Sequence, residues 1–471
     1  MINRFTMAVC SHAPIWAQNL LCTWAGRRYE KLRHGGDNDR WRAFYAQSRN
    51  YSLAESKEYQ REQLKELLRE TYESVPYYAE RWQRAGLSAD DVRDVEDLPK
   101  LPCTTKEDLF GAGDTILATW ADKRRLVRGM TGGSTGMPLP RYFTPAELQK
   151  HYAISWDRLR QGVTKGQRYA TFQGKEVVPP GQRRPPHWRE NRASNQRLYS
   201  MSHLSPEKLQ DYAQSLVDEP FEYYQGYVSI MSVIAQFMAE NGCKLASAPK
   251  AIFTTSEQLT RADRELFETT WQTKVWNEYN QGERCAMIAE CEAGNYHQQM
   301  DYGVIEYEPI DREGDLLLAE IICTGFIPRA APLVRYRVGD RVLIDEGATC
   351  PCGRPGPVIK AIRGRISDYI VTPDGRKYPH ISLIVDLLHN VRRTQVVQER
   401  AEEITVRVVR FPRYSEADEK HLIRCFEERI GGGIRAIPEY VTALERRPNG
   451  KVLSIINRIP GHGRGRSIDA D

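Results

Sequence analysis

The sequence predicts an α/β fold, with a large N-terminal domain of parallel or mixed sheets flanked by helices and a small, mobile C-terminal α+β lid domain. Three observations support this prediction. Short β-branched runs alternate with helical patterns from about residue 125 onward, as is typical of parallel sheets. A β-α-β pattern follows Gly364. The chain of 471 residues, 41% hydrophobic and 27% charged, is long and apolar enough for two or three domains.

Residues 1–100 are predicted to form a helical segment that packs on the large domain. Met1 to Arg28 indicates an amphipathic helix, because polar residues interrupt its apolar run and its arginines come last, whereas a signal peptide has its basic residues first. Contact of this helix with a membrane surface stays open. Ser52 to Trp82 has helical periodicity. Thr104 or Thr105 is predicted to cap the next helix, because a hydroxyl can accept hydrogen bonds from the first backbone N–H groups.

The large domain, 101–363, is predicted to alternate strands and helices. In chain order these are the strand RYATFQG, the helix MSVIAQFMAENG, the strand KAIFTT, the helix RADRELFETTW and the strand KVWNEYN. Ligands of open α/β sheets bind beyond the carboxyl ends of the strands, where loops carry polar groups. Most of the motifs below fall at such positions.

The lid domain, 364–460, is predicted to begin with the hairpin DYIVTPDGRKY, whose turn is Pro373-Asp374-Gly375. The strand ITVRVVRF, the amphipathic helix SEADEKHLIRCFEERIG and the closing segment RRPNGKVLSIINRI follow. The tail, 461–471, is rich in Gly and Arg and is predicted to be disordered.

Charge and cysteine usage argue against several classes of protein. Lys plus Arg (67) against Asp plus Glu (62) gives a net charge of +5, spread along the chain, which argues against a nucleic-acid partner. No apolar run reaches the ~18 residues of a transmembrane segment. The 10 cysteines are too sparse for a disulfide scaffold, so a cytoplasmic, reducing setting is expected. The densest basic stretch, Arg183 to Arg197, is predicted to be a loop that lines an anionic pocket.

The segment MTGGSTG is the first strong chemical signal. Its glycines let the backbone approach a ligand closely, its hydroxyls add donors, and its consecutive N–H groups form an anion nest. It is not the Walker loop, because no Lys follows its last glycine. For this segment alone, an ordinary surface turn is the alternative. The loop residues are Thr131, Gly132, Gly133, Ser134, Thr135 and Gly136.

The segment TGGSTGMP resembles the phosphate loop of adenylate-forming enzymes, the superfamily of acyl-CoA synthetases, luciferases and peptide-synthetase adenylation domains. In that family the loop holds the β- and γ-phosphates of ATP. The family often has Lys after the last glycine or the proline, where this chain has Met137 and Leu139. Arg141 is a candidate replacement for that positive charge.

Two further motifs resemble the family in the same order. YNQGE is similar to the Tyr-Gly-x-x-Glu element, which implies that Tyr279 stacks near adenine and that Glu283 binds Mg²⁺. A flat ring and a hard oxygen ligand suit these roles. PLVRYRVGD closely resembles the Tyr-Arg-x-Gly-Asp element, so Asp340 would accept both ribose hydroxyls.

Two more motifs follow toward the C-terminus. IRGRISDYI resembles the hinge element Gly-Arg-x-Asp-Asp, which places Arg365 at the ribose or phosphate side and a hinge at Ser367 and Asp368. The family usually has Asp where this chain has Ser367. RPNGK resembles the C-terminal Pro-x-x-x-Gly-Lys signature, and its Lys451 would bridge the substrate carboxylate and the α-phosphate.

LPCTTKEDL and PDGRKY narrow the resemblance to the phenylacetate–CoA ligase-like family. The segments PPHWRENRASNQRLYSMSHLSPEKL, YYQGYVSIMSVIAQFM and IFTTSEQL are most similar to its capsular-polysaccharide-biosynthesis branch. By that likeness, Ser256 and Glu257 lie near the adenine and acyl pocket.

The same family often carries a structural metal site, and this chain has ligands for one in Cys291, His297, Cys350 and Cys352. A Cys₃His set is a common closed, tetrahedral zinc site. It would clamp the segment after the magnesium carboxylate to the loop after the ribose-binding aspartate. Cys285 is a competing ligand, and four unrelated residues are the alternative.

The resemblance implies ATP-dependent activation of a small carboxylic acid to an acyl-adenylate, followed by transfer of the acyl group to coenzyme A. The expected cofactors are ATP, Mg²⁺ and structural Zn²⁺. An amine or hydroxyl acceptor, in polysaccharide or small-metabolite biosynthesis, is the alternative to coenzyme A. A catalytically inactive, zinc-stabilised binding protein is a third interpretation. A homodimer is compatible with these features.

Overall fold

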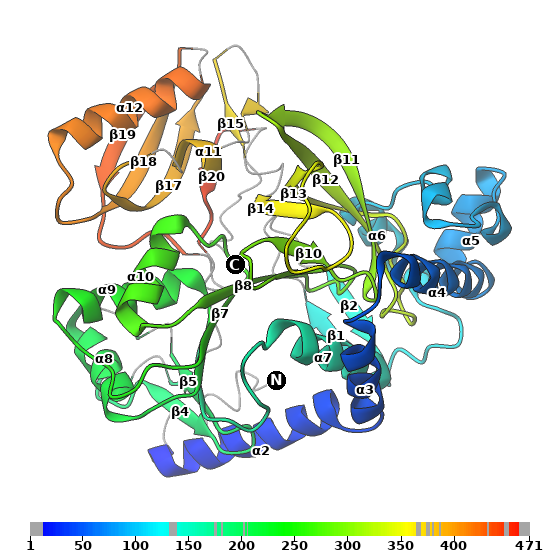
Figure 1. The fold of residues 1–471 in the computed structure, drawn as a ribbon, viewed down its shortest axis with the longest axis horizontal. Helices are drawn as coiled ribbons and strands as arrows, with labels where there is room; N and C mark the ends of the chain where they lie inside the picture. Colours follow the sequence, from blue (N-terminus) through cyan, green and yellow to red (C-terminus); the bar gives the residue numbers. More distant parts are fainter. Residues whose placement is uncertain are drawn as a thin grey trace.

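The computed structural model describes residues 13–460 apart from short gaps. The gaps are 131–138, 174–176, 180–181, 201–202, 205, 364–368, 374–376, 379–380, 386–387, 431–432 and 447–451. Figure 1 shows a large central sheet, helices on both of its sides, and a smaller sheet with helix α12 beside it, coloured orange to red.

The helices fall in three groups along the chain. The N-terminal group is α2 (Ile15–His34), α3 (Asn38–Ser48), α4 (Leu53–Ser74), α5 (Pro76–Arg84) and α6 (Lys106–Ala112), with the short 3₁₀ helices Ala89–Asp91, Val95–Lys100 and Gly113–Ile116. The middle group is α7 (Pro145–Leu159), α8 (Leu209–Asp218), α9 (Val228–Glu240) and α10 (Arg261–Trp271), with a 3₁₀ turn at Pro206–Lys208. The last group is α11 (Ile381–Val385) and α12 (Glu416–Ile430).

Twelve strands form the large sheet, in the order β11-β12-β13-β14-β10-β9-β8-β7-β6-β3-β5-β4. Their bounds are β3 Tyr169–Phe172, β4 Trp188–Asn191, β5 Gln196–Tyr199, β6 Tyr223–Gly226, β7 Ala251–Thr255, β8 Val275–Asn280, β9 Met287–Glu290, β10 Tyr296–Gln298, β11 Gly303–Glu313, β12 Leu316–Gly325, β13 Tyr336–Asp345 and β14 Val358–Arg363. Five neighbouring strands, in the spatial order β8-β7-β6-β3-β5, are parallel to one another. Every other neighbouring pair in this sheet is antiparallel. The sheet is therefore mixed.

Three smaller sheets complete the described part of the chain. A hairpin of β1 (Val127–Met130) and β2 (Pro140–Phe143) flanks the glycine-rich segment, and a second of β15 (Ile370–Val371) and β16 (Lys377–Tyr378) confirms the predicted hairpin strands. The third sheet has the order β19-β18-β17-β20 and its own apolar core under α12. Its strands are β17 Val391–Arg400, β18 Glu403–Arg410, β19 Arg435–Tyr440 and β20 Ile455–Asn457.

Polar caps at the helix starts follow from the sequence. Ser52 begins α4 in a capping box with Glu55, and Thr144 begins α7 in the same way with Glu147. Thr105, and not Thr104, caps α6, because its hydroxyl accepts from the backbone N–H of Asp108. Thr104 instead bonds through its backbone to Arg335 and Arg337 beside β13.

The parallel strands have two different faces, because successive side chains along a strand point to opposite sides. On the helix-covered face, side chains are buried against α8, α9 and α10; they include Ala170, Phe172, Tyr224, Ile252 and Val275. On the opposite, cavity face, side chains line an open volume together with α2 and α7; they include Tyr169, Tyr223, Gln225, Phe253, Thr255, Glu278 and Asn280.

The predicted fold class is confirmed, and one local prediction is wrong. The basic stretch Arg183 to Arg197 is largely the hairpin of β4 and β5, not a loop. Arg189 and Arg197 are buried and bonded to other side chains, and of the arginines in this stretch only Arg192, in the turn between the strands, lines the cavity. The domain boundaries near 100 and 363 stay predictions. No helix in the described ranges is both long and apolar enough to span a bilayer.

Candidate active site

Near the carboxyl end of β8, a side-chain contact to β13 joins two of the sequence motifs. Tyr279, near the end of β8, donates its hydroxyl to Asp340 Oδ2 on β13 at 2.6 Å. Burial, and then the Asp340 carboxylate, raises the pKa of Tyr279 well above its ordinary value. The phenol therefore stays protonated and acts as the donor, which fixes the Asp340 carboxylate at the sheet edge.

Glu283 lies in the turn that follows β8 and is buried, with 4% of its surface exposed. Its carboxylate forms no ion pair with any residue in the described ranges. The next residue, Arg284, has a positive φ of 59°, and its guanidinium lies 4.7 Å from the ring of Phe143 on β2. This contact connects the carboxylate turn to the strand that follows the glycine-rich segment. A buried carboxylate without an ion-pair partner among the described residues suits a divalent metal ion.

Arg141 on β2 is the cation that the sequence suggested as a replacement for the missing lysine. It is buried, and it donates through Nη2 to the backbone oxygen of Ala331 at 3.2 Å. Its Nε and Nη1 have no hydrogen-bond partner among the described residues. The side chain therefore retains donors that an anionic ligand could use.

Ser256 and Glu257 follow β7, and Ser256 adopts φ = 67°, which is uncommon for a residue other than glycine. Glu257 accepts hydrogen bonds from the backbone N–H of Ser229 at 2.7 Å and from its hydroxyl at 2.9 Å, at the start of α9. A carboxylate at a helix N-terminus is stabilised there by the orphan N–H groups and the helix dipole. Glu257 also accepts from the backbone N–H of Val452 at 3.1 Å.

The C-terminal segment is tied to the same place by a second side chain. Arg446 donates to Ser229 Oγ at 2.6 Å and to Ser229 O at 3.0 Å. Arg446 and Val452 pair with each other as an antiparallel bridge. The two ends of the segment 446–452 therefore lie against the loop after β7 and the start of α9.

Several predicted site residues lie outside the described residues. They are Thr131, Gly132, Gly133, Ser134, Thr135 and Gly136 of the phosphate loop, Arg365, Ser367 and Asp368 of the hinge segment, and Lys451. The segments that flank them are described. The phosphate loop connects β1 to β2, and Lys451 immediately precedes Val452.

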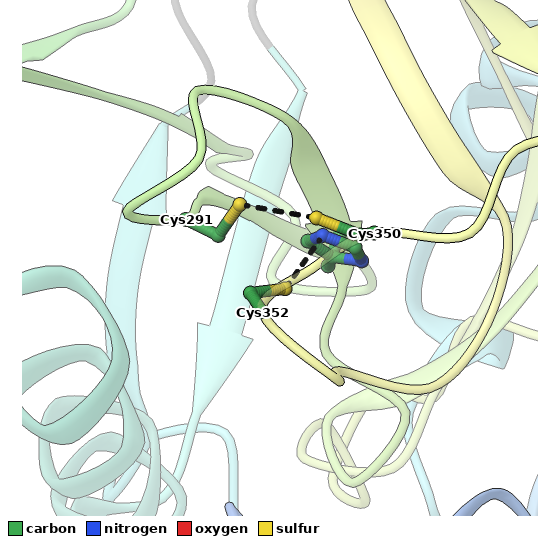
Figure 2. Close-up of side chains that lie close together, drawn as sticks. Cys291, Cys350 and Cys352 are labelled. Atoms are coloured by element: carbon green, nitrogen blue, oxygen red, sulfur yellow. Dashed lines mark hydrogen bonds between the residues drawn. The ribbon is translucent and has the colours of Figure 1, made fainter.

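Four predicted metal ligands come together from two separate segments, the β9–β10 hairpin and the loop between β13 and β14; Figure 2 labels the three cysteines. The ligand atoms of Cys291, His297, Cys350 and Cys352 all lie within 4.8 Å of one another. The sulfurs of Cys291 and Cys350 are 3.7 Å apart, and Cys352 Sγ lies 3.3 Å from His297 Nε2. A tetrahedral zinc with Zn–S bonds of about 2.3 Å separates its sulfurs by about 3.8 Å, so the residues fit this ion.

Cys285, which the sequence left as a competing ligand, is not part of this cluster. Its thiol donates to Gln281 Oε1 at 2.7 Å, and it lies in the apolar core beneath β11–β13. The cluster connects the β9–β10 turn, through Cys291, with the loop between β13 and β14. One of these elements follows the Glu283 turn and the other follows the strand of Asp340.

Sequence reasoning missed Ser229 and Arg446, which join α9 to the C-terminal segment. Arg446 stands next to the quoted segment RPNGK, but a lone arginine gives no signal of its partner. It also missed the cavity residues of α2, since that helix is distant in sequence from every motif.

Comparisons with known proteins extend these observations. Residues 370–458 match the family described as the CapK C-terminal domain. The chain is 26% identical to the protein CapK of Staphylococcus aureus over 460 residues, which cover 96% of this chain and 99% of that protein. It is 25% identical to a phenylacetate-coenzyme A ligase of Thermus thermophilus over 344 residues, covering 68% of this chain and 72% of the ligase.

The fold is similar to that of solved ligases. A 2-hydroxyisobutyryl-CoA ligase in the postadenylation state, in complex with R3-HIB-AMP, matches with a TM-score of 0.65 and 17% identity, over 88% of this chain and 91% of the ligase. An open conformation of the same ligase, in complex with 2-HIB-AMP and CoA, matches with a TM-score of 0.54 and 18% identity, over 86% of this chain and 92% of the ligase. These similarities support the predicted resemblance to the phenylacetate–CoA ligase-like family of adenylate-forming enzymes and to its capsular-polysaccharide-biosynthesis branch.

Proposed function

We propose that the protein is an AMP-forming acid ligase. A carboxylate oxygen of the acid attacks the α-phosphorus of ATP, the bond from that phosphorus to the bridging oxygen of pyrophosphate breaks, and acyl-AMP and pyrophosphate form. Positioning and charge stabilisation account for most of the rate in phosphoryl transfers of this kind. The family and the fold support this proposal at the level of acyl-adenylate formation.

The described residues suit the binding of the nucleotide. Asp340 has a second carboxylate oxygen besides the one that accepts from Tyr279, so it could accept from a ribose hydroxyl. Glu283 would hold Mg²⁺, which supplies charge neutralisation on the phosphates when bound. Thr131 to Gly136 would hold the triphosphate, with Arg141 as an added cation behind the loop.

The observation that carries the proposal is the contact of the C-terminal segment with the loop after β7. Val452 N–H donates to Glu257 at 3.1 Å, and β7 is the direct neighbour of β8, which carries Tyr279. This arrangement supports a role for Lys451 at the reacting phosphate. Withdrawal of that segment, with Ser367 or Asp368 as the hinge, would then open the acyl-adenylate to an acceptor.

Acid-dependent exchange of labelled pyrophosphate into ATP tests the proposal. A panel of carboxylic acids is assayed with the wild type, with Lys451→Ala and with Lys420→Ala, a surface lysine of α12 that pairs with Glu416. We expect at least one acid to support exchange, a loss of about 10²–10³ in rate for Lys451→Ala, and no change for Lys420→Ala. Normal exchange in Lys451→Ala would refute the assigned role.

Coenzyme A is the proposed acceptor, since the solved relatives of this fold include a CoA ligase with 2-HIB-AMP and CoA bound. The similarity to CapK over nearly the whole chain favours a second candidate, an amine or hydroxyl acceptor. Incubation with ATP, the acid and each acceptor, followed by product masses, separates a thioester from an amide or ester. An inactive binding protein would instead give no exchange with any acid.

We also propose that Cys291, His297, Cys350 and Cys352 hold a structural zinc ion. Structural zinc sites are closed, with four protein ligands, and they contribute directly to folding energy. Here the ion would join the turn after β9 to the loop after β13. It would hold the two sides of the nucleotide site in place, without taking part in the chemistry.

A further inference from the structure

The cavity face of the sheet borders a volume of about 1340 Å³ that the reaction as proposed leaves unassigned. Its lining residue Thr255 immediately precedes Ser256, and Asn280 immediately follows Tyr279, so the cavity adjoins the proposed adenylation site. Small-molecule pockets typically measure about 300–1,000 Å³. The cavity therefore has room for an acid much larger than a simple aryl acid.

Aromatic and polar side chains line this volume together. Tyr169 and Tyr223 stack with ring centroids 4.6 Å apart, and Phe253 lies at the next strand on the same face. Helix α2 and helix α7 close the opposite side, with Tyr29 and Tyr152. Such walls suit an elongated ligand that has both apolar and hydrogen-bonding parts.

Five cationic side chains line the cavity, and two of them are paired with carboxylates. Arg160 pairs with Glu278 at 2.8 Å, and Lys165 pairs with Glu30 at 3.5 Å. The remaining three are Arg33, Arg42 and Arg192. Within the described ranges, Arg42 contacts a carboxylate only at 4.0 Å, that of Asp39 on its own helix.

Arg33 differs from the other four. Its guanidinium lies 4.6 Å from the ring centroid of Tyr152 and 4.9 Å from that of Tyr29, and it forms no side-chain hydrogen bond or ion pair with a residue of the described ranges. The guanidinium carbon thus lies over two aromatic rings, which attract its charge without using its N–H donors. This arrangement favours bidentate binding of a carboxylate, phosphate or sulfate.

Burial and the same nearby cations lower the pKa of two neighbouring histidines. Burial, and then Lys165, lowers the pKa of His34 to about 4, and Arg33 and Arg42 contribute in the same direction. Burial, and then Arg284 and Arg33, lowers the pKa of His151 well below its ordinary value. Both imidazoles are therefore neutral at pH 7, and the arginines supply the charge.

We propose that the acid activated by this protein carries a second anionic group, and that Arg33, held between Tyr29 and Tyr152, binds it. This inference rests on the proposed ligase function, which it extends to the class of substrate. The reacting carboxylate is consumed when it joins AMP, whereas the second group stays charged through both half-reactions. Arg33 thus selects acids with two anionic groups over acids with one.

Matched pairs of acids test this selection. Each pair consists of a dicarboxylic acid and its monomethyl ester, or of a phosphorylated hydroxy acid and the same acid without phosphate. Pyrophosphate release is measured for the wild type, Arg33→Met, Arg33→Lys and Arg28→Met. Arg28 is the matched control, because it lies 5.2 Å from the ring of Trp24 on the same helix but outside the cavity lining.

We expect the wild type to prefer the doubly anionic member by about tenfold or more in kcat/KM, as befits a charged hydrogen bond. Arg33→Met should bring that ratio close to one, Arg33→Lys should keep part of it, and Arg28→Met should leave it unchanged. A wild type that prefers the singly charged acids would overturn the inference. So would an equal loss for both members of each pair in Arg33→Met, because that result would assign Arg33 to the reacting carboxylate.

Direct binding separates this inference from the ligase proposal. If no acid releases pyrophosphate, the ligase proposal fails, and calorimetry without ATP then decides the role of the cavity. The inference would be supported if the wild type binds the dicarboxylates or phosphorylated acids more tightly than the singly charged member of each pair. Arg33→Met should then lose this binding. Absence of binding to the wild type would refute it.

Discussion

The two faces of the parallel strands use the same backbone for opposite purposes. The helix-covered face buries apolar side chains under α8, α9 and α10, and Phe172, Tyr212 and Trp271 have no exposed surface there. The cavity face of the same strands carries Tyr169, Gln225 and Glu278 beneath α2 and α7. Burial of the first face is expected to supply stability, whereas the second turns polar and aromatic groups toward a volume that a ligand can fill.

The two regions also differ in the kind of contact that joins their elements, which is polar around the cavity and apolar under the helices. Around the cavity and the strand ends, the elements are joined by Tyr279 to Asp340, by Glu257 to Val452, and by the four clustered cysteine and histidine residues. These contacts are directional, so they fix positions that a nonpolar interface would leave adjustable. Four predictions examine this division, from the largest effect to the smallest.

Removal of the metal ligands is expected to have the largest effect. Cys350→Ser should reduce zinc to well under half an equivalent and lower the thermal midpoint more than any single core truncation does, because structural zinc contributes about 10–16 kcal/mol in small zinc domains. Metal analysis and calorimetry measure the two quantities. Purified wild type with less than about half an equivalent of zinc would remove the zinc proposal.

Cys285→Ser is the matched control for the metal. Its thiol is buried but bonded to Gln281, outside the cluster, so this variant should keep its full zinc content. Loss of zinc in Cys285→Ser would mean that the cluster has a different set of ligands.

Substitution of two aromatic residues of β3 compares how much each face contributes to stability. Phe172 stacks on Tyr199 on the helix-covered face, and Tyr169 stacks on Tyr223 on the cavity face. Phe172→Ala should lower the free energy of unfolding by about 3–5 kcal/mol, because it leaves a void in a closed core. Tyr169→Ala should cost only ~1–2 kcal/mol but raise the KM for the acid. Equal losses of stability would contradict the division.

Substitution of Glu257 tests how much its polar contact with Val452 stabilises the C-terminal segment. Glu257→Ala should lower the free energy of opening of the Val452 amide by about 1.5–3 kcal/mol, since the lost hydrogen bonds involve a charged acceptor. Hydrogen exchange at Val452 is the measurement. Glu257→Gln should retain part of the protection, and Glu439→Ala, which removes only a surface partner of Arg407, should retain all of it. Unchanged exchange in Glu257→Ala would show that the contact does not hold the segment.

The smallest effect is expected at a helix cap far from both faces. Ser52 caps α4 and exchanges hydrogen bonds with Glu55. Ser52→Ala should lower the free energy of unfolding by ~1 kcal/mol, with no change in the KM for the acid. Ser52→Thr, which keeps the hydroxyl, should restore most of the stability. A change in KM would mean that this region communicates with the cavity.

Local patterns predicted the strands and helices that carry the site, but not the partners of individual residues. The alternating apolar runs gave β3, α9, β7, α10 and β8 in order, because strand and helix periods are properties of neighbouring residues. The family resemblance pointed to the three cysteines and His297 as ligands, but only the fold excludes Cys285. Side-chain hydrogen bonds across long sequence separations have no local signal.

The cavity shows the same limit most clearly. Arg33 is one of many arginines in the sequence, and it becomes distinctive only because α2 places it between Tyr29 and Tyr152. The basic stretch that the sequence assigned to a pocket turned out to bury Arg189 and Arg197 in the β4–β5 hairpin. Charge density along the chain therefore pointed to the right neighbourhood, but of the arginines in that stretch only Arg192 lines the cavity.

The strict alternation of the two faces also determines how this protein could diversify. Substitutions at every second position of β3, β6, β7 and β8 can reshape the ligand cavity while the residues between them preserve the core. Relatives could thus acquire binding of other ligands through substitutions at Tyr169, Tyr223 or Phe253. Insertion or deletion of one residue within these strands would invert both faces at once, so lineages should vary in loop length but not in strand length.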